Sequence, residues 1–241
     1  MAGLPMIHQP SLLVGIMITT TGPNKGDAVP NTPTPVGTQN QADAHYGQGS
    51  ELSRMFKSFY NNNFSNEVWG QGVPEPTAGV AAHGDITVTT VPTEAGTIWL
   101  YVGGELVPDI NITTTDTADD IAQAIADAVN AEGDLPVTAV TATGGKVTLT
   151  CKWKGVSGND IRTDLNYYGT IGGQILPIGL GITLPTGNTL AGGVGVPDFT
   201  AAISALGEKN FEYVALPYTD SNSLFQWEDE YGFGDNGRTR I

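Results

Sequence analysis

The most regular pattern of apolar and polar positions lies in the middle of the chain. In the segment DITVTTV, Ile86 and Val88 alternate with threonines, as the two faces of a half-buried strand do. The segments TIWLYVGGELV, DINIT and VTAVTATGGKVTLTCKW predict further strands, with glycine-pair turns at residues 103–104 and 144–145. The pattern therefore predicts several strands between residues 84 and 168.

One amphipathic helix interrupts these strands. In TDTADDIAQAIADAVNAEGDLP, Ile121, Ile125 and Val129 recur at the spacing of one helix face. Asp116 or Thr117 caps the first turn, where acidic residues also suit the helix dipole. Strands followed by one helix and more strands predict a compact α+β unit.

The two ends of the chain follow another pattern. Residues 11–18, SLLVGIMI, predict a buried strand, and residues 19–39 are rich in proline and predict a loop or an extended arm. A short amphipathic helix begins after Ser50, its N-cap. Near the C-terminus, residues 198–231 predict a helix, a buried strand and a second helix. This succession is typical of an α/β layer.

Together these patterns predict an α+β fold in two domains. A β-rich α+β domain with one helix, residues 81–170, is inserted into an α/β domain. Residues 1–80 and 190–241 supply that α/β domain, and the Gly- and Pro-rich residues 171–189 form a linker.

The charge of the chain excludes several kinds of partner. The net charge is −15, with 10 Lys and Arg against 25 Asp and Glu. An acidic protein lacks the basic face that nucleic acid or an anionic membrane surface requires. The apolar residues 11–18 are too few for the ~20 residues of a membrane-spanning helix. We therefore expect neither a nucleic-acid nor a membrane partner.

The residue types that usually carry chemistry form no recognisable site. Cys151, the single cysteine, lies in a predicted strand, where a buried and unreactive thiol is expected. The histidines His8, His45 and His83 lack metal-ligand spacing, and the chain has neither a Gly-x-Ser-x-Gly nor a Walker motif. We expect no enzyme activity, metal or cofactor.

One strand end needs a separate test, because α/β enzymes often place catalytic groups there. The string ALPYTD follows the strand near residue 213, and Asp220 is its acidic group. A hydrolase would need a nucleophile and a base beside it, and the sequence offers no such pair. The alternative is that Pro217 sets the turn and Thr219 or Asp220 caps the next helix. Tyr218 then serves packing or a subunit contact.

Five strings, taken in order, resemble the contractile tail sheath protein of Mu-type bacteriophages. They are HYGQGSELSRMFKSFYNNN (45–63), AGTIWLYVGGE (95–105), DTADDIAQAIADAVNAEGDLPVTA (116–139), VTLTCKWKGVSGNDI (147–161) and VALPYTD (214–220). The positions that carry the motifs are Gly47, Gly49, Ser50, Gly158, Asn159, Asp160, Pro217, Tyr218, Thr219 and Asp220. The resemblance covers nearly the whole chain.

The resemblance implies a mechanical function. Such subunits stack as rings into a sheath around the tail tube protein, between the baseplate and the tail terminator. The sheath assembles in the host cytoplasm, becomes part of the virion, and contracts to drive the tube through the host envelope. The resemblance implies no catalytic residue and no cofactor. Family members are about twice as long, so the chain is expected to lack the C-terminal half that contacts the tube.

A second class of function remains open from the sequence. The middle domain is rich in strands and threonine, and it contains Trp99 and Trp153. Aromatic rings of this kind can stack on sugars. A carbohydrate-binding or adhesin module is therefore the alternative to a sheath subunit.

Overall fold

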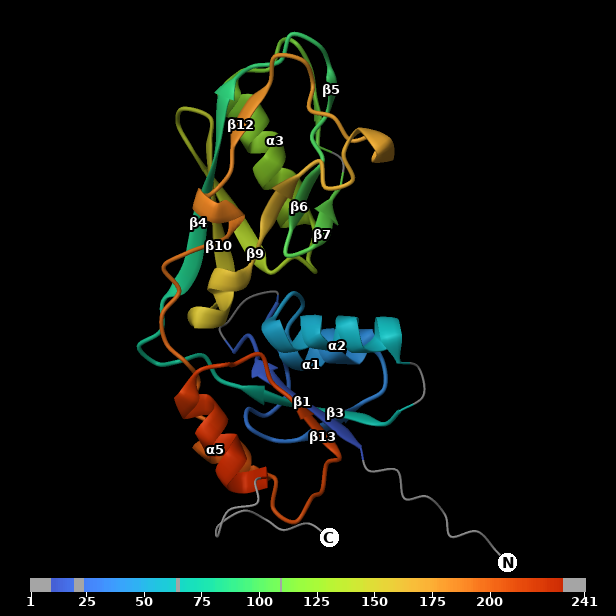
Figure 1. Ribbon diagram of the computed structural model, residues 1–241, viewed down its shortest axis with the longest axis vertical. Helices are drawn as coiled ribbons and strands as arrows, with labels where there is room; N and C mark the ends of the chain where they lie inside the picture. The colour runs from blue at the N-terminus through green and yellow to red at the C-terminus, as the bar shows by residue number, and fades with distance from the viewer. Residues whose placement is uncertain (1–9, 20–23, 64–65, 109, 232–241) are drawn as a thin grey trace, which may run out of the picture. The chain divides into compact units, whose positions relative to one another are not determined.

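The computed structural model describes residues 10–19, 24–63, 66–108 and 110–231 (Figure 1). The chain forms two compact units: unit 1 comprises residues 1–75 and 196–241, and unit 2 comprises residues 76–195. Helices and sheets occur together, so the chain is α+β as predicted.

A sheet of four strands, in the order β13-β1-β3-β2, forms the centre of unit 1. Its elements are β1 (Ser11–Ile16), β2 (Thr34–Val36), β3 (Val68–Val73), β13 (Tyr213–Ala215), α1 (Gln39–Tyr46), α2 (Glu51–Asn62), α4 (Thr200–Ala205) and α5 (Ser221–Tyr231). β1 runs parallel to β13 and β3, with Leu12 opposite both Val214 and Trp69. β2 runs antiparallel to β3. Because parallel neighbours need a long connection, β1 and β3 are joined through α1 and α2.

The core of unit 1 contains residues of α1 and α2 together with residues of the sheet. Leu13 and Val68 of the strands join Tyr46, Leu52 and Phe56 of the helices in one buried cluster. The rings of Tyr46 and Phe56 stack with centroids 5.7 Å apart, and burial raises the pKa of Tyr46. β1 is buried on both faces, as is usual for a central parallel strand.

Unit 2 contains the strands that the alternating pattern predicted. Its elements are β4 (Ala81–Thr90), β5 (Gly96–Thr97), β6 (Leu100–Val102), β7 (Glu105–Val107), β8 (Asn111–Ile112), α3 (Ala118–Ala131), β9 (Val137–Ala142), β10 (Lys146–Lys154), β11 (Thr163–Leu165) and β12 (Gly181–Thr183). Three 3-10 helices follow β10, namely η1 (Val156–Asp160), η2 (Thr170–Gly172) and η3 (Thr186–Asn188).

Antiparallel pairing connects all of these strands. The main sheet has the order β12-β4-β10-β9, a second has the order β11-β6-β7, and β5 pairs with β8. The helix α3 packs on the main sheet through Ile121, Ile125 and Val129, which are all buried. Thr117 is its N-cap, which decides between the two caps that the sequence left open. The predicted hairpin at residues 144–145 is confirmed by the pairing of β9 with β10.

The segment 171–189, expected to be a linker, needs correction. β12 lies within it and pairs with β4, with Ile182 opposite Val88. The strand has three residues, too few for an alternation to show in the sequence. Unit 2 therefore extends to residue 195, beyond the boundary expected at residue 170.

Two expectations for unit 1 were also wrong. The segment 19–39 is not only an arm, because it contains β2 and the first residue of α1. The strand β13 is largely exposed and not buried, since the exposed fraction of Tyr213 is 67%. Its three residues pair with β1 alone among the described strands, so β13 is an edge strand of the sheet.

Candidate functional site

The motif positions fall into three groups along the chain, and the first, residues 47–50, shapes the junction between α1 and α2. Gly47 and Gly49 have positive φ angles of 90° and 75°, in the left-handed region that glycine adopts without strain. Ser50 is buried, and its Oγ accepts a hydrogen bond from the backbone N–H of Ser53 at 3.1 Å. Ser50 is therefore the N-cap of α2, as the sequence predicted.

Glu51, the residue after this cap, joins the first motif to the last one, residues 217–220. Glu51 is 6% exposed, and its Oε2 accepts a hydrogen bond from the backbone N–H of Ile16 at 2.8 Å. The same oxygen accepts a hydrogen bond at 2.5 Å from the hydroxyl of Tyr218, which lies 167 residues away along the chain. A buried carboxylate is stable only where such donors replace water. Glu51 thus connects the end of β1, the start of α2 and the turn before α5.

Tyr218 gains a role that the sequence left undecided. Its side chain is 3% exposed, and its ring packs edge-on against Phe199 with centroids 5.3 Å apart. Phe199 in turn contacts the buried ring of Trp227 on α5. Of the two roles expected for Tyr218, packing within the subunit is therefore the one that these contacts support.

The remaining residues of the last motif form a turn and a cap. Asp220 Oδ1 accepts a hydrogen bond from the backbone N–H of Ser223 at 2.9 Å, so Asp220 caps α5. Burial alone would raise the pKa of Asp220, but hydrogen bonds from Ser223 and from the backbone of residues 220 and 222 together outweigh it and lower that pKa. Pro217 and Thr219 are exposed. A carboxylate engaged in a helix cap is poorly placed to act as the acid or base of a hydrolase.

The middle motif, residues 158–160, belongs to unit 2, whereas the other two belong to unit 1. Asn159 Nδ2 donates a hydrogen bond to the carbonyl of Gly193 at 3.0 Å, and Asn159 Oδ1 accepts one from the Gly193 N–H at 2.8 Å. The side chain thus pairs with a backbone segment as a neighbouring strand would. Gly158 is buried against Ala82 and Cys151, where a Cβ would come within 3.0–3.1 Å of both side chains. Asp160 is exposed.

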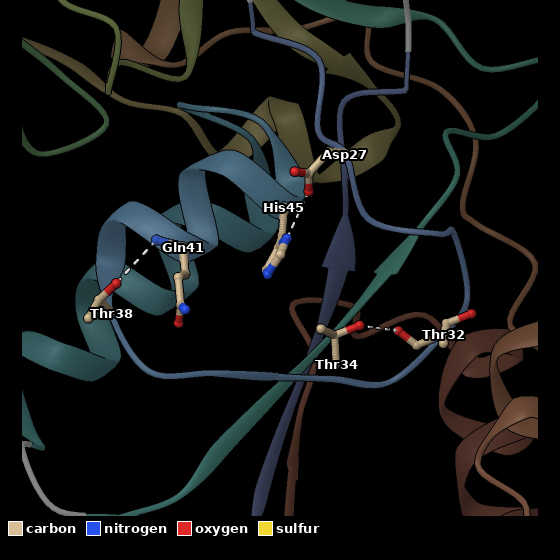
Figure 2. Close-up of polar contacts among 6 residues, drawn as sticks. All are labelled: Asp27, Thr32, Thr34, Thr38, Gln41 and His45. Carbon is tan, nitrogen blue, oxygen red and sulfur yellow. Dashed lines mark hydrogen bonds and ion pairs between the residues drawn. The ribbon is translucent and has the colours of Figure 1, made fainter.

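Figure 2 shows how α1 and the loops beside it are fixed by polar contacts. Thr38 Oγ1 accepts a hydrogen bond from the backbone N–H of Gln41 at 3.2 Å and caps α1. His45 Nδ1 lies 2.7 Å from Asp27 Oδ1 and ties α1 to the preceding loop. Thr34 donates to the carbonyl of Thr32 at the start of β2. These contacts fix the local fold around α1. The His45 side chain is paired there with a single carboxylate, that of Asp27.

Sequence reasoning missed α1, although a signal for it was present. Thr38 followed by Gln41 has the form of a capping box, a known helix start. In the structure the Gln41 side chain does reach back, and its Oε1 accepts a hydrogen bond from the Gly37 N–H at 2.8 Å. The four prolines of the preceding segment masked this signal.

The described part of the chain contains no group of three or more His, Cys, Asp or Glu residues that could hold a metal ion. His83 lies in unit 2, whereas His45 lies in unit 1, and His8 falls outside the described residues. Cys151 is buried, as expected. None of the described helices is long and apolar enough to span a membrane.

The tryptophan pair behind the carbohydrate alternative is not an exposed platform. Trp153 is 4% exposed, and its Nε1 donates a hydrogen bond to Ser157 Oγ at 3.0 Å. Trp99 is partly buried. A ring must be accessible to stack on a sugar, so Trp153 belongs to the core of unit 2.

The chain was compared with known proteins. It is 33% identical over 223 residues to the Mu-like prophage FluMu tail sheath protein of Haemophilus influenzae, and the match covers 92% of this chain. The resemblance to the tail sheath proteins of Mu-type phages is confirmed. The chain spans only 43% of the length of that sheath protein. No protein-family profile matches the chain.

A solved sheath tail protein from Listeria innocua was also found. It shares 12% sequence identity with this chain, covering 92% of this chain and 43% of its own, at a TM-score of 0.30. Such a score is too low to carry an argument about fold or function. The similarity to the Haemophilus sheath protein therefore rests on the sequence alone.

Proposed function

We propose that this chain forms part of a structural subunit of a contractile phage tail sheath. The observation that carries the proposal is the 33% identity to a Mu-like tail sheath protein across 92% of the chain. In this proposal, copies of the subunit polymerise as rings around the tail tube protein, between the baseplate and the tail terminator. The assembled sheath contracts and drives the tube through the host envelope.

The contacts of the motif residues support a structural function over an enzymatic one. Ser50 and Asp220 cap helices, Tyr218 is held by the buried Glu51, and Asn159 pairs with a backbone segment. Each of these side chains is engaged in the fold. The proposal therefore includes no catalytic residue and no cofactor, and it places the chain in the virion after assembly in the host cytoplasm.

The two units also receive proposed roles. Unit 1, which contains the first and last motifs, would belong to the sheath domain that continues in longer sheath proteins. Unit 2, formed by residues 76–195, would be the outer domain inserted into it. The division of the chain into two compact units supports these roles, because no sheet is shared between the units and each has buried side chains of its own.

The test is to locate the chain in assembled particles. A short epitope inserted at the exposed β9–β10 turn, residues 143–144, would be introduced into the gene of the bacterium or phage that carries it. Negative-stain microscopy with gold-labelled antibody is expected to show label along the whole tail sheath, in extended and in contracted particles. Particles from the untagged strain are the control. Label confined to heads or fibres, or tails that persist when the gene is deleted, would contradict the proposal.

A further inference from the structure

Unit 2 presents a loop that exposes large apolar side chains. We define the apolar loop as residues 167–175, which follow β11 and include η2. The exposed fractions of its large side chains are 67% for Tyr167, 64% for Tyr168, 101% for Ile171 and 59% for Ile175. Scattered single apolar residues are normal on a protein surface, whereas large apolar side chains exposed together are typical of interaction sites.

The apolar loop is held in one conformation by hydrogen bonds. Gln174 is 5% exposed, its Oε1 accepts a bond from the Tyr168 N–H at 2.9 Å, and its Nε2 donates to the Tyr101 hydroxyl at 2.5 Å. The rings of Tyr101, Tyr167 and Tyr168 pack together with centroids 5.2–6.1 Å apart. The exposed side chains therefore stand on a rigid base, and binding through them would cost little ordering entropy.

Charge distinguishes this part of the surface from the rest of the chain. Residues 165–197 include no Asp, Glu, Lys, Arg or His, although the chain as a whole carries a net charge of −15. The nearest charged residues before the loop, Arg162 and Asp164, neutralise each other at 2.7 Å. Copies of an acidic chain repel one another, and the repulsion is least where both surfaces are neutral.

We propose that the apolar loop is a contact with a second copy of this chain in the assembled sheath. The inference rests on the proposed function and names one surface through which the proposed sheath subunits would contact each other. Burial of Ile171 and its neighbours would supply the hydrophobic part of that contact, and the lack of charge on the loop itself would let two acidic subunits approach. The loop lies in unit 2, so the outer domain takes part in holding neighbouring subunits together.

A sugar ligand fits the apolar loop less well. Carbohydrate sites combine an aromatic face with polar groups that fix the orientation of the hydroxyls. Here Ile171 and Ile175 stand beside the tyrosines, and the side-chain amide of Gln174 is already engaged by Tyr168 and Tyr101. An apolar protein surface is the better complement.

The test uses cysteine accessibility in tagged particles. Cys151 is the only native cysteine and is buried, so a new exposed cysteine can be labelled selectively. Ile171→Cys is compared with Val140→Cys, a matched control on β9 that is 68% exposed in the same unit. Maleimide labelling of Ile171→Cys is expected to be about tenfold slower in intact sheaths than in dissociated chains. The control is expected to label at the same rate in both states.

Introducing a charge at the same two positions tests the contact independently, through the yield of intact sheaths. Ile171→Asp is expected to reduce the yield of intact sheaths about tenfold or more, because a carboxylate would be buried without a partner. Val140→Asp should leave the yield unchanged. The thermal midpoint of the free chain should be the same for both variants, since both side chains are exposed.

The outcomes separate the two proposals. Intact sheaths in which Ile171→Cys labels as fast as in the dissociated chain would overturn the loop contact and leave the sheath function standing. A chain that is absent from sheaths but protects Ile171→Cys when it self-associates would overturn the sheath function and keep the loop as a self-contact. Glycan binding by the free chain that is lost in Tyr167→Ala and Tyr168→Ala would overturn the self-contact in favour of a sugar site.

Discussion

The two units differ in how far apart along the chain their paired strands lie. In unit 2, β9 and β10 pair across a glycine turn, and β6 and β7 do the same, while β4 pairs with the more distant β10 and β12. In unit 1, β1 pairs with β13, so Ser11 lies opposite Tyr213. A local pair forms with a small loss of loop entropy, whereas a distant pair needs side-chain contacts that specify it. Unit 2 therefore combines local hairpins with longer-range pairs, whereas none of the strand pairs described in unit 1 is a tight hairpin.

The largest expected effect tests the core of unit 1. Phe56→Ala removes a fully buried ring that stacks on Tyr46, and it should lower the free energy of unfolding by about 3–5 kcal/mol. Hydrogen exchange is expected to rise in α1, α2 and β3. Phe225→Ala is the control, because this phenylalanine is 65% exposed. Equal loss of protection in β10 would show that the units do not differ in the way we describe.

The next effect tests the local turn of unit 2. Gly144 and Gly145 have φ angles of 85° and 71°, so alanine at either position should cost about 1–2 kcal/mol in backbone strain. A Cβ at residue 145 would also come within 2.8 Å of Ala118 Cβ, whereas residue 144 faces open space. Gly145→Ala should thus cost about 1–3 kcal/mol more than Gly144→Ala in urea denaturation. Equal costs would mean that packing against α3 is unimportant to this turn.

A smaller effect isolates the long-range hydrogen bond of unit 1. Tyr218→Phe removes the hydroxyl that donates to Glu51 and leaves a buried carboxylate with one donor fewer. We expect a loss of about 1–3 kcal/mol, with faster exchange of the Ile16 amide, which bonds to the same oxygen. Tyr213→Phe is the matched control at an exposed tyrosine on β13. Indistinguishable melting of the two variants would argue against Glu51 as the connection between the distant segments.

The smallest effect concerns the capping box of α3. Thr117→Ala should cost about 1 kcal/mol, because Thr117 Oγ1 accepts a hydrogen bond from the Asp120 N–H. Hydrogen bonds from the Thr117 side chain and backbone lower the pKa of Asp120.

The lowered pKa of Asp120 sets the direction of a pH effect. Its stabilisation is present above the unfolded pKa of about 3.9 and is lost as the pH falls through the lower folded value. Asp120→Asn should therefore reduce the loss of stability between neutral and acidic pH, measured by urea denaturation. Because Asp198 and Asp220 also have lowered pKa values, part of the pH dependence should persist in this variant. An unchanged pH dependence would contradict the role of Asp120.

Elements with a local sequence pattern could be predicted, whereas elements that depend on distant partners could not. The alternation around Ile86, the stripe of α3 and the cap at Ser50 are local patterns, and the structure bears them out. β12 and β2 have three residues each, too few for a period to show. β13 has apolar residues that predicted burial, but it is an edge strand, and its position in the sheet decides its exposure.

The sequence was enough to name the motif residues, but it could not show which of their side chains meet in the fold. The helix cap at Ser50 follows from residue type and spacing. For α3 and α5 the sequence leaves two candidates each, and in the structure Thr117 and Asp220 accept a hydrogen bond from an N–H three residues on. The meeting of Glu51 with Tyr218 does not follow from the sequence, since no local spacing relates residues 167 positions apart. Folding alone places that hydroxyl against that carboxylate, because burial leaves each of them in need of a hydrogen-bonding partner.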